Sequence, residues 1–161
     1  MYFRRIFRKT YRRGVGMILV NEVGHIFLGK RAKMQEDTWQ MPQGGIDRGE
    51  TLTQAMKREM MEEVGTNAFE IIAESAQWYR YDFPTILRDN LWGGRFRGQQ
   101  QKWFLLRFTG TDAMINIATH HQEFSAWQWA SKEETLSLVV GFKEELYQQV
   151  LSDMWPMLEK A

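Results

Sequence analysis

The chain has 161 residues, long enough to bury one hydrophobic core, and its 43% hydrophobic content, with 7 Trp and 10 Phe, excludes a disordered polypeptide. It has no cysteine, which excludes disulfides, zinc–thiolate sites and thiol catalysis, and no apolar run approaches the length of a membrane span. We therefore predict one cytoplasmic domain over residues 1–161, with no membrane partner and a formal net charge of +1.

Positive charge gathers at the start of the chain. Residues 1–14 carry no acidic residue but contain Arg4, Arg5, Arg8, Lys9, Arg12 and Arg13. We predict a basic arm over residues 1–10, which would favour an anionic partner; a solvated chain end is an equal alternative. A cleavable leader is disfavoured because the arm has no serine and runs directly into an apolar segment.

Two short apolar segments follow the arm. Residues 15–20 and 25–29 predict strands, and the turn residues 21–24 between them favour a hairpin. A second basic cluster follows, formed by Lys30, Arg31 and Lys33.

Residues 42–65 predict a loop, a helix and a stop. Pro42, Gly44, Gly45 and Gly49 indicate a loop. Residues 50–64 contain neither Gly nor Pro and are rich in helix formers, and Gly65 stands where a helix ends.

The predicted helix places acidic side chains where a helix does not favour them. Its core-facing side carries Leu52, Ala55, Met56 and Met60; Glu59 and Glu63 fall in the same sector, with Glu62 at its edge. Near a helix C-terminus the macrodipole disfavours anions by about 0.3–1 kcal/mol each, and neighbouring like charges add to this. A bound Mg²⁺ or Mn²⁺ would offset that cost, since hard cations prefer oxygen ligands. The alternative is a solvated acidic helix end in which Arg58 pairs with Glu62.

The second half of the chain predicts more strands and two helices. We expect an extended segment over 69–83, a loop over 86–101, a buried strand over 102–108 and a strand over 123–130, followed by helices over 132–138 and 142–158. In the strand over 123–130, Phe124, Ala126 and Gln128 should share one face. This order indicates mixed α/β layers.

The loop–helix stretch resembles a known family. Its pattern G-x5-E-x7-R-E-U-x-E-E-x-G-U, with U aliphatic, is the Nudix box, matched here by Gly44, Glu50, Arg58, Glu59, Glu62, Glu63 and Gly65. Only Thr66 departs, at an aliphatic position without a metal role. The resemblance implies an α/β/α sandwich with a central mixed β-sheet and a divalent metal held by Glu59, Glu62, Glu63 and the Gly44 carbonyl. It also implies that Arg58 orients a carboxylate and that Glu50 steadies the loop.

Flanking segments are similar to one group in that family, the bacterial RNA pyrophosphohydrolases, also described as (di)nucleoside polyphosphate hydrolases and as invasion-associated proteins. The matching segments include YRRGVGMILVN, PQGG, GQQQKWF, EFSAWQW and VVGFKEELYQQV. By resemblance Glu123 is a fourth metal carboxylate or the base for water, and the predicted substrate contacts are Arg12, Arg31, Tyr81, Gln99, Val140, Phe142 and Lys143. The group does not use His120 or His121, which we interpret as loop residues. The chain departs from the group at Arg13, Gly14 and Gly141, near the expected position of the RNA 5′ end.

The resemblance implies Mg²⁺-dependent hydrolysis of a nucleotide 5′ polyphosphate. We expect Arg12 at the 5′ phosphates, a purine between Arg31 and Phe142 with Val140 and Lys143 at its edge, and removal of pyrophosphate from triphosphorylated RNA, which promotes mRNA decay. The alternatives are hydrolysis of diadenosine polyphosphates, in which RNA is incidental, and a non-catalytic RNA-binding module. We predict no stable protein partner and favour a monomer.

Overall fold

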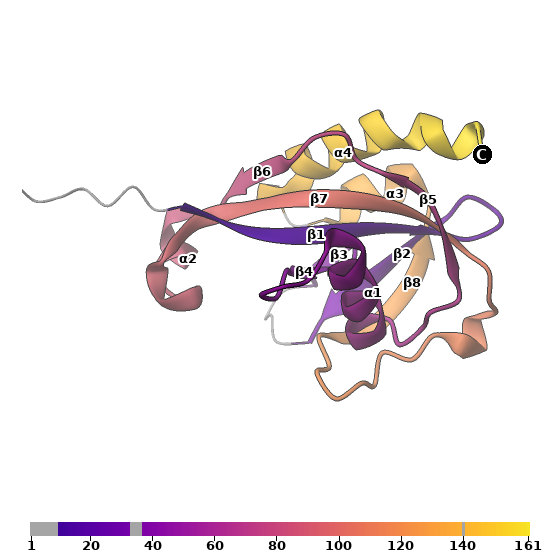
Figure 1. Ribbon diagram of the computed structural model, residues 1–161, viewed down its shortest axis with the longest axis horizontal. Coiled ribbons are helices and arrows are strands. Elements are labelled where there is room, and N and C mark those ends of the chain that lie inside the picture. Colours follow the sequence, from indigo (N-terminus) through magenta and orange to yellow (C-terminus); the bar gives the residue numbers. More distant parts are fainter. Residues whose placement is uncertain (1–9, 33–36, 140) are drawn as a thin grey trace, which may run out of the picture.

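The computed structural model describes residues 10–32, 37–139 and 141–161, which form an α/β/α sandwich around one mixed β-sheet (Figure 1). The predicted fold class is therefore confirmed. The basic arm, apart from Thr10, lies outside the described residues, as does Val140.

The sheet contains eight strands within the described residues, and its main path runs β3–β2–β1–β7–β5, with β4 and β1, β6 and β7, and β8 and β2 paired beside it. The strands are β1 (Thr10–Val20), β2 (Ile26–Arg31), β3 (Trp39–Gln40), β4 (Gln43–Gly45), β5 (Phe69–Glu74), β6 (Tyr79–Asp82), β7 (Phe96–Phe108) and β8 (Phe124–Ala130). The pair β1–β7 is parallel and extends from Thr10–Phe96 to Val20–Arg107, with a register shift between Thr10 and Tyr11, whereas the other pairs are antiparallel.

Helices cover both faces of the sheet. They are α1 (Leu52–Glu63), α2 (Thr85–Arg88), α3 (Lys132–Leu138) and α4 (Gly141–Glu159), with single 3₁₀ turns η1 (Trp92–Gly94) and η2 (Asp112–Met114). In Figure 1, α1 lies below the sheet and α3 and α4 lie above it. Alternate residues of β1 serve the two faces: Val15, Met17 and Leu19 pack with α1, whereas Ile18 and Val20 pack with α4.

The first helix has the predicted core face but begins two residues later than predicted. Ala55, Met56 and Met60 are fully buried. The Thr51 hydroxyl accepts a hydrogen bond from the Gln54 amide, and the Gln54 side chain accepts one from the Thr51 amide. This capping box fixes the start at Leu52 and leaves Glu50 in the loop. Gly65 has a φ of 71°, as its predicted stop position requires.

The loop predicted over 86–101 is wrong in its second half. β7 begins at Phe96, so the buried strand predicted over 102–108 is longer by six residues. The added part carries Gln99 and Gln101, which are 3% and 0% exposed. Buried polar residues break the alternation of apolar and polar side chains by which a strand is recognised.

The face predicted for the strand over 123–130 is also wrong. Phe124 pairs with Arg31 and Ala126 pairs with Lys30, so Ser125 is an extra residue in a β-bulge. The bulge turns Phe124 to the side of Trp127, which stacks on Phe27 at a centroid distance of 5.7 Å. The predicted hairpin and the helix over 132–138 are confirmed. Among the described residues, no helix combines the length and apolar character needed to cross a membrane.

Candidate active site

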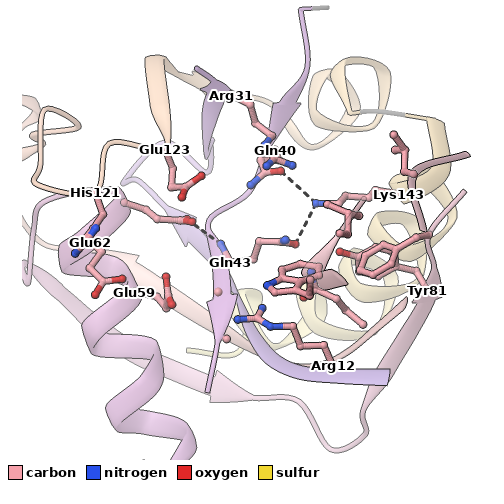
Figure 2. Close-up of a pocket in the computed structure, with 18 of the residues that line it drawn as sticks. Arg12, Arg31, Gln40, Gln43, Glu59, Glu62, Tyr81, His121, Glu123 and Lys143 are labelled. Carbon is pink, nitrogen blue, oxygen red and sulfur yellow. Dashed lines mark hydrogen bonds between the residues drawn. The ribbon is translucent and has the colours of Figure 1, made fainter. Parts of the chain in front are cut away.

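A cleft of about 580 Å³ separates two groups of opposite charge (Figure 2). On the left of that view lie carboxylates from α1 and from the segment before β8; on the right lie cationic and aromatic side chains from β1, β6 and α4, with β4 between them. The acidic wall contains Glu59, Glu62, Glu63 and Glu123; the opposite wall contains Arg12, Arg31, Tyr81, Gln99, Phe142 and Lys143. Every predicted site residue within the described part of the chain therefore lines this one cleft.

Two glycines of β4 let both walls approach the same strand. A Cβ added at Gly44 would collide with the Glu59 carboxylate, and one added at Gly45 would collide with the Arg12 guanidinium. β4 is held in place by pairing with β1, where Gly44 faces Val15. A Cβ at either position would therefore displace the charged end of Glu59 or Arg12.

Arg58 joins the loop before α1 to the helix. Its Nε donates to Glu50 Oε1 at 2.7 Å, and its terminal nitrogens donate to Glu59 Oε1 at 2.8 Å, Glu62 Oε2 at 3.2 Å and the Gly45 carbonyl at 2.8 Å. The hydrogen bond from Arg58 is the main cause that lowers the pKa of Glu50. The Glu62–Arg58 pair of the alternative reading is thus present, but Glu62 also lines the cleft.

The acidic wall is buried at two of its carboxylates. Burial raises the pKa of Glu59 to about 7, against the opposing effect of its ion pair with Arg58. Burial also raises the pKa of Glu63 well above its usual value, and the charges of Glu59 and Glu123 add to the rise. The backbone N–H of Gln43 donates a hydrogen bond to Glu63 Oε2 at 3.0 Å. Negative charge is therefore costly here unless a cation accompanies it.

The donor set fits a hard divalent cation. The carboxylates of four glutamates and the backbone carbonyls of β4 supply oxygen ligands, and the His121 imidazole lies beside Glu62 and Glu123. Within the described ranges no three His, Asp or Glu side chains converge as a ready metal cage. Arg58 Nη1 donates to both the Glu59 and the Glu62 carboxylate.

Lys143 is the buried cation of the opposite wall. It is 2% exposed, and its Nζ donates to Gln40 Oε1 and Gln43 Oε1, both at 3.2 Å. Burial, with a contribution from the charge of Arg31, lowers the pKa of Lys143 to about 7. The ammonium also lies 5.6 Å from the centroid of the Tyr81 ring. The glutamine side chains thus hold this cation at the base of the cleft.

Aromatic rings continue from Lys143 toward the cleft opening. Tyr81 and Phe142 have ring centroids 6.2 Å apart at an interplanar angle of 32°, and Phe83 contacts the Tyr81 edge. Burial raises the pKa of Tyr81 to about 12, so its hydroxyl is protonated at neutral pH. Arg31 and Phe142, the residues of the predicted purine sandwich, both line this cleft.

Arg12 marks the end of the cleft nearest η1. Its guanidinium lies 4.5 Å from the centroid of the Trp92 ring and against Gly45. Burial lowers the pKa of Arg12 from its usual value, and the nearby Glu59 charge opposes that change. Stacking on Trp92 holds this long side chain in one place.

Sequence reasoning missed several cleft residues, namely Gln40, Gln43, Trp92 and His121, and the buried Gln101 that contacts Gln43. Gln101 is fully buried, and its Nε2 donates to Gln43 Oε1 at 3.1 Å and to Gln99 Oε1 at 3.3 Å. The only signal in the sequence was an unusual run of glutamines beside the predicted strand over 102–108. His121 belongs to a loop, as predicted, but that loop borders the cleft beside Glu62 and Glu123 (Figure 2).

Comparisons with known proteins agree with this geometry. The model of the NUDIX domain matches residues 10–150. A Rickettsia africae (strain ESF-5) protein named RNA pyrophosphohydrolase is 50% identical over 156 residues, covering 97% of each chain. One from Rickettsia rickettsii (strain Sheila Smith), with the same name, is 51% identical over 149 residues, covering 92% of each.

Solved structures extend the likeness to the fold. The E. coli dihydroneopterin triphosphate pyrophosphohydrolase has a TM-score of 0.66 at 19% identity, covering 88% of this chain and 97% of its own. A C. elegans Ap4A hydrolase binary complex has a TM-score of 0.64 at 18% identity, covering 88% and 96%. At such identities the likeness concerns the fold alone.

Proposed function

Because the chain belongs to the NUDIX domain family, we propose that it is a pyrophosphohydrolase that acts on the 5′ end of RNA. It removes pyrophosphate from a 5′-triphosphate end, or phosphate from a 5′-diphosphate end, and leaves a 5′-monophosphate. The two Rickettsia relatives carry the name of this activity and align with nearly the whole chain. We further propose that the reaction takes place in the cytoplasm, where it prepares transcripts for decay.

The observation that carries the proposal is the division of the cleft by charge. Four glutamates stand on one wall, and Arg12, Arg31 and Lys143 stand on the other. A polyphosphate is densely anionic, so it needs cations on both sides before water can attack it. The wall with Arg12, Arg31 and Lys143 supplies cationic side chains. The wall with the four glutamates supplies ligands for a metal cation.

We assign the acidic wall to Mg²⁺, with Mn²⁺ as a substitute, held by Glu59, Glu62 and Glu63 with Glu123 and the Gly44 carbonyl. When bound, the metal neutralises phosphate charge and lowers the pKa of water. Arg58 keeps Glu59 and Glu62 beside each other, and the Gln43 amide fixes the rotamer of Glu63. These contacts orient the proposed ligands.

The remaining residues bind the substrate and move a proton. A water oxygen forms a bond to phosphorus, the bridging P–O bond breaks, and its electron pair leaves with the pyrophosphate. Glu123 accepts the proton of the attacking water, and Arg12 and Lys143 hold the phosphate oxygens whose charge grows. Phe142 and Arg31 stack the first base, and Tyr81 and Gln99 line the phosphate path, which suits an unstacked single-stranded end.

A direct comparison of substrates tests this proposal. Triphosphorylated RNA oligomers and diadenosine tetraphosphate are incubated side by side with Mg²⁺, and the released products are separated. We expect pyrophosphate and monophosphorylated RNA as the principal products. Faster turnover of diadenosine tetraphosphate, insensitive to salt, would instead make the chain a dinucleoside polyphosphate hydrolase.

The matched variants are Glu62→Gln in the acidic wall and Glu70→Gln on β5, an exposed glutamate outside the cleft. Glu62→Gln should lower Mg²⁺-dependent turnover by about 10²-fold or more with an unchanged melting temperature, whereas Glu70→Gln should keep full activity. Full activity of Glu62→Gln removes Glu62 from the metal ligands. If the unsubstituted protein shows no turnover but still binds RNA, the alternative of a non-catalytic RNA-binding module is supported.

A further inference from the structure

The sheet face that packs on α1 continues past that helix as an exposed surface. Val15 faces α1, and Arg13 and Tyr11 precede it at intervals of two in the same strand, so they lie on the same face. Arg13, Arg80 and Arg97 are exposed, and Tyr11 and Lys102 are half-buried. In Figure 1, β1 and β7 extend well past α1 toward β6 and α2.

Strand register lines these side chains up in rows. Arg13 of β1 pairs with Gln100 of β7, and Gln100 pairs with Arg80 of β6. In the neighbouring row Tyr11 pairs with Gly98, and Gly98 pairs with Asp82. Because Gly98 has no side chain, the Tyr11 hydroxyl reaches across it and donates to Asp82 Oδ1 at 2.6 Å.

Each cation of this surface is laid on an aromatic ring. Arg80 and Arg97 both lie 5.1 Å from the centroid of the Tyr11 ring. Arg13 lies 4.5 Å and Lys102 lies 6.0 Å from the centroid of the Trp78 ring. We name this set the β1–β7–β6 face: Tyr11, Arg13, Trp78, Arg80, Arg97 and Lys102.

Two further contacts fix the cations. Arg97 donates to Asp82 Oδ2 at 2.9 Å, and the Lys102 ammonium donates to the carbonyls of Ser75 and Ala76 at 2.8 and 3.2 Å. Carbonyls carry no net charge, so these two contacts do not neutralise the charge of Lys102. A long side chain that is already ordered loses less entropy when it binds a ligand.

We propose that the β1–β7–β6 face binds the sugar–phosphate backbone of single-stranded RNA a few nucleotides downstream of the 5′ end held in the cleft. This inference rests on the proposed function. Arg12 lies between Tyr11 and Arg13 in β1 and points into the cleft, so the face and the cleft are the two sides of one strand. Among the described residues β4 pairs with β1 from Gly14 onward, which leaves the edge at residues 10–12 open for a chain to cross.

Charge and chemistry favour RNA as the occupant. The phosphates of a nucleic-acid strand are spaced at intervals, and so are the cations of this face. The guanidinium groups of arginine can also stack on unpaired bases. Phosphate contacts of this kind are indifferent to sequence and sensitive to salt. An enzyme that acts on many transcripts needs that indifference.

Binding and turnover test the proposal separately. Fluorescence anisotropy measures the affinity for a 5′-hydroxyl RNA of about 12 nucleotides, within the range of single-strand site sizes, over a series of salt concentrations. The protein is the full chain, compared with the triple variant Arg13→Gln/Arg80→Gln/Arg97→Gln and with Lys132→Gln. Lys132 makes the same kind of contact, 5.6 Å from the centroid of the Trp155 ring, on α3.

We expect the triple variant to bind about tenfold or more weakly, and the slope of log affinity against log salt to become less negative by about 2, since each single-strand phosphate contact contributes about 0.7. Lys132→Gln should bind as the unsubstituted chain does. With triphosphorylated substrates, KM should rise for the RNA of about 12 nucleotides and stay constant for a dinucleotide. Because anisotropy requires no hydrolysis, a failure of the proposed activity leaves this test standing.

Other outcomes overturn the proposal. Equal affinity and equal salt slope in the triple variant and the unsubstituted chain would show that RNA does not use this face. If polyglutamate binds as tightly as the RNA and depends on the same three arginines, the face serves an acidic protein. A circular dichroism melt of the triple variant within a few degrees of the parent excludes unfolding as the cause of weaker binding.

Discussion

Replacing Lys143 by methionine should stabilise the protein and impair it at once. Lys143 is 2% exposed and has two glutamine oxygens as its hydrogen-bond partners. Burial lowers its pKa from 10.5 to about 7, which means that the folded chain resists its positive charge. Methionine fills a similar volume without charge, so the folded state no longer carries that cost.

The magnitude follows from the pKa and the hydrogen bonds. A fall from 10.5 to about 7 corresponds to about 5 kcal/mol, at about 1.4 kcal/mol per pKa unit. Against this, Gln40 Oε1 loses its donor, which costs about 1–3 kcal/mol. Gln43 Oε1 keeps the Gln101 donor. The free energy of unfolding of Lys143→Met should therefore exceed that of the parent by about 2–4 kcal/mol at pH 7.

The gain should depend on pH in a defined direction. Because the pKa of Lys143 is lower in the folded state, the folded chain binds fewer protons than the unfolded chain between pH 7 and 10.5. The free energy of unfolding of the parent therefore rises with pH across that window. The advantage of Lys143→Met should shrink over the same window and turn into a deficit near its upper end. Turnover of triphosphorylated RNA should fall, since the phosphates lose a cation.

Urea unfolding followed by tryptophan fluorescence, at several pH values from 7 to 10.5, measures these differences. Lys132→Met, on the half-buried lysine over Trp155, is the control and should change stability by less than about 1 kcal/mol. A Lys143→Met protein less stable than the parent at pH 7 would refute the reasoning, because the charge of Lys143 would then not be the costly group.

Three further outcomes follow from the acidic wall. Gly44→Ala places a Cβ on the Glu59 carboxylate, which is the end of a flexible side chain and can move aside. Turnover should therefore fall by about tenfold or more while the melting temperature changes by only a few degrees, both measurable on purified protein. After chelation of divalent metal, the raised pKa of Glu59 should make the free energy of unfolding fall as pH rises from 4.5 through about 7. Added Mg²⁺ should restore the free energy of unfolding, and a profile that does not change with pH would contradict the prediction. Arg58→Lys keeps the charge but cannot bridge Glu50, Glu59 and Glu62 together, so Mg²⁺ titration of activity should give an apparent affinity weaker by about tenfold; an unchanged affinity would remove Arg58 from ligand positioning.

Local signals in the sequence were sufficient for much of the fold. The 3.6-residue period of α1 predicted its core face, and with it the inward position of Glu59 and Glu63. The closing helices and the first hairpin followed from turn residues and apolar spacing. The first half of β7 could not be predicted, since Gln99 and Gln101 are buried polar residues, and Gln101 donates to Gln99 and to Gln43 of β4.

The site divides in the same way. The ligand carboxylates were predictable because their spacing is contained in one helix, and the resemblance gave that spacing a chemical meaning. The hydrogen bonds between Lys143, Gln40 and Gln43 were not, because they join residues about 100 positions apart. The β-bulge at Ser125 was equally hidden, since a one-residue insertion is visible only against the partner strand. The roles of the individual side chains in substrate binding stay predictions until variants are measured.

The parallel pairing of β1 with β7 has a consequence for synthesis of the protein. Tyr11 meets Gly98 only after the polypeptide between them has been made, and Lys143 reaches the base of the cleft only when α4 has joined the sheet. Such high contact order delays productive folding. A nascent chain therefore has no working centre until α4 has been synthesised and has packed on the sheet.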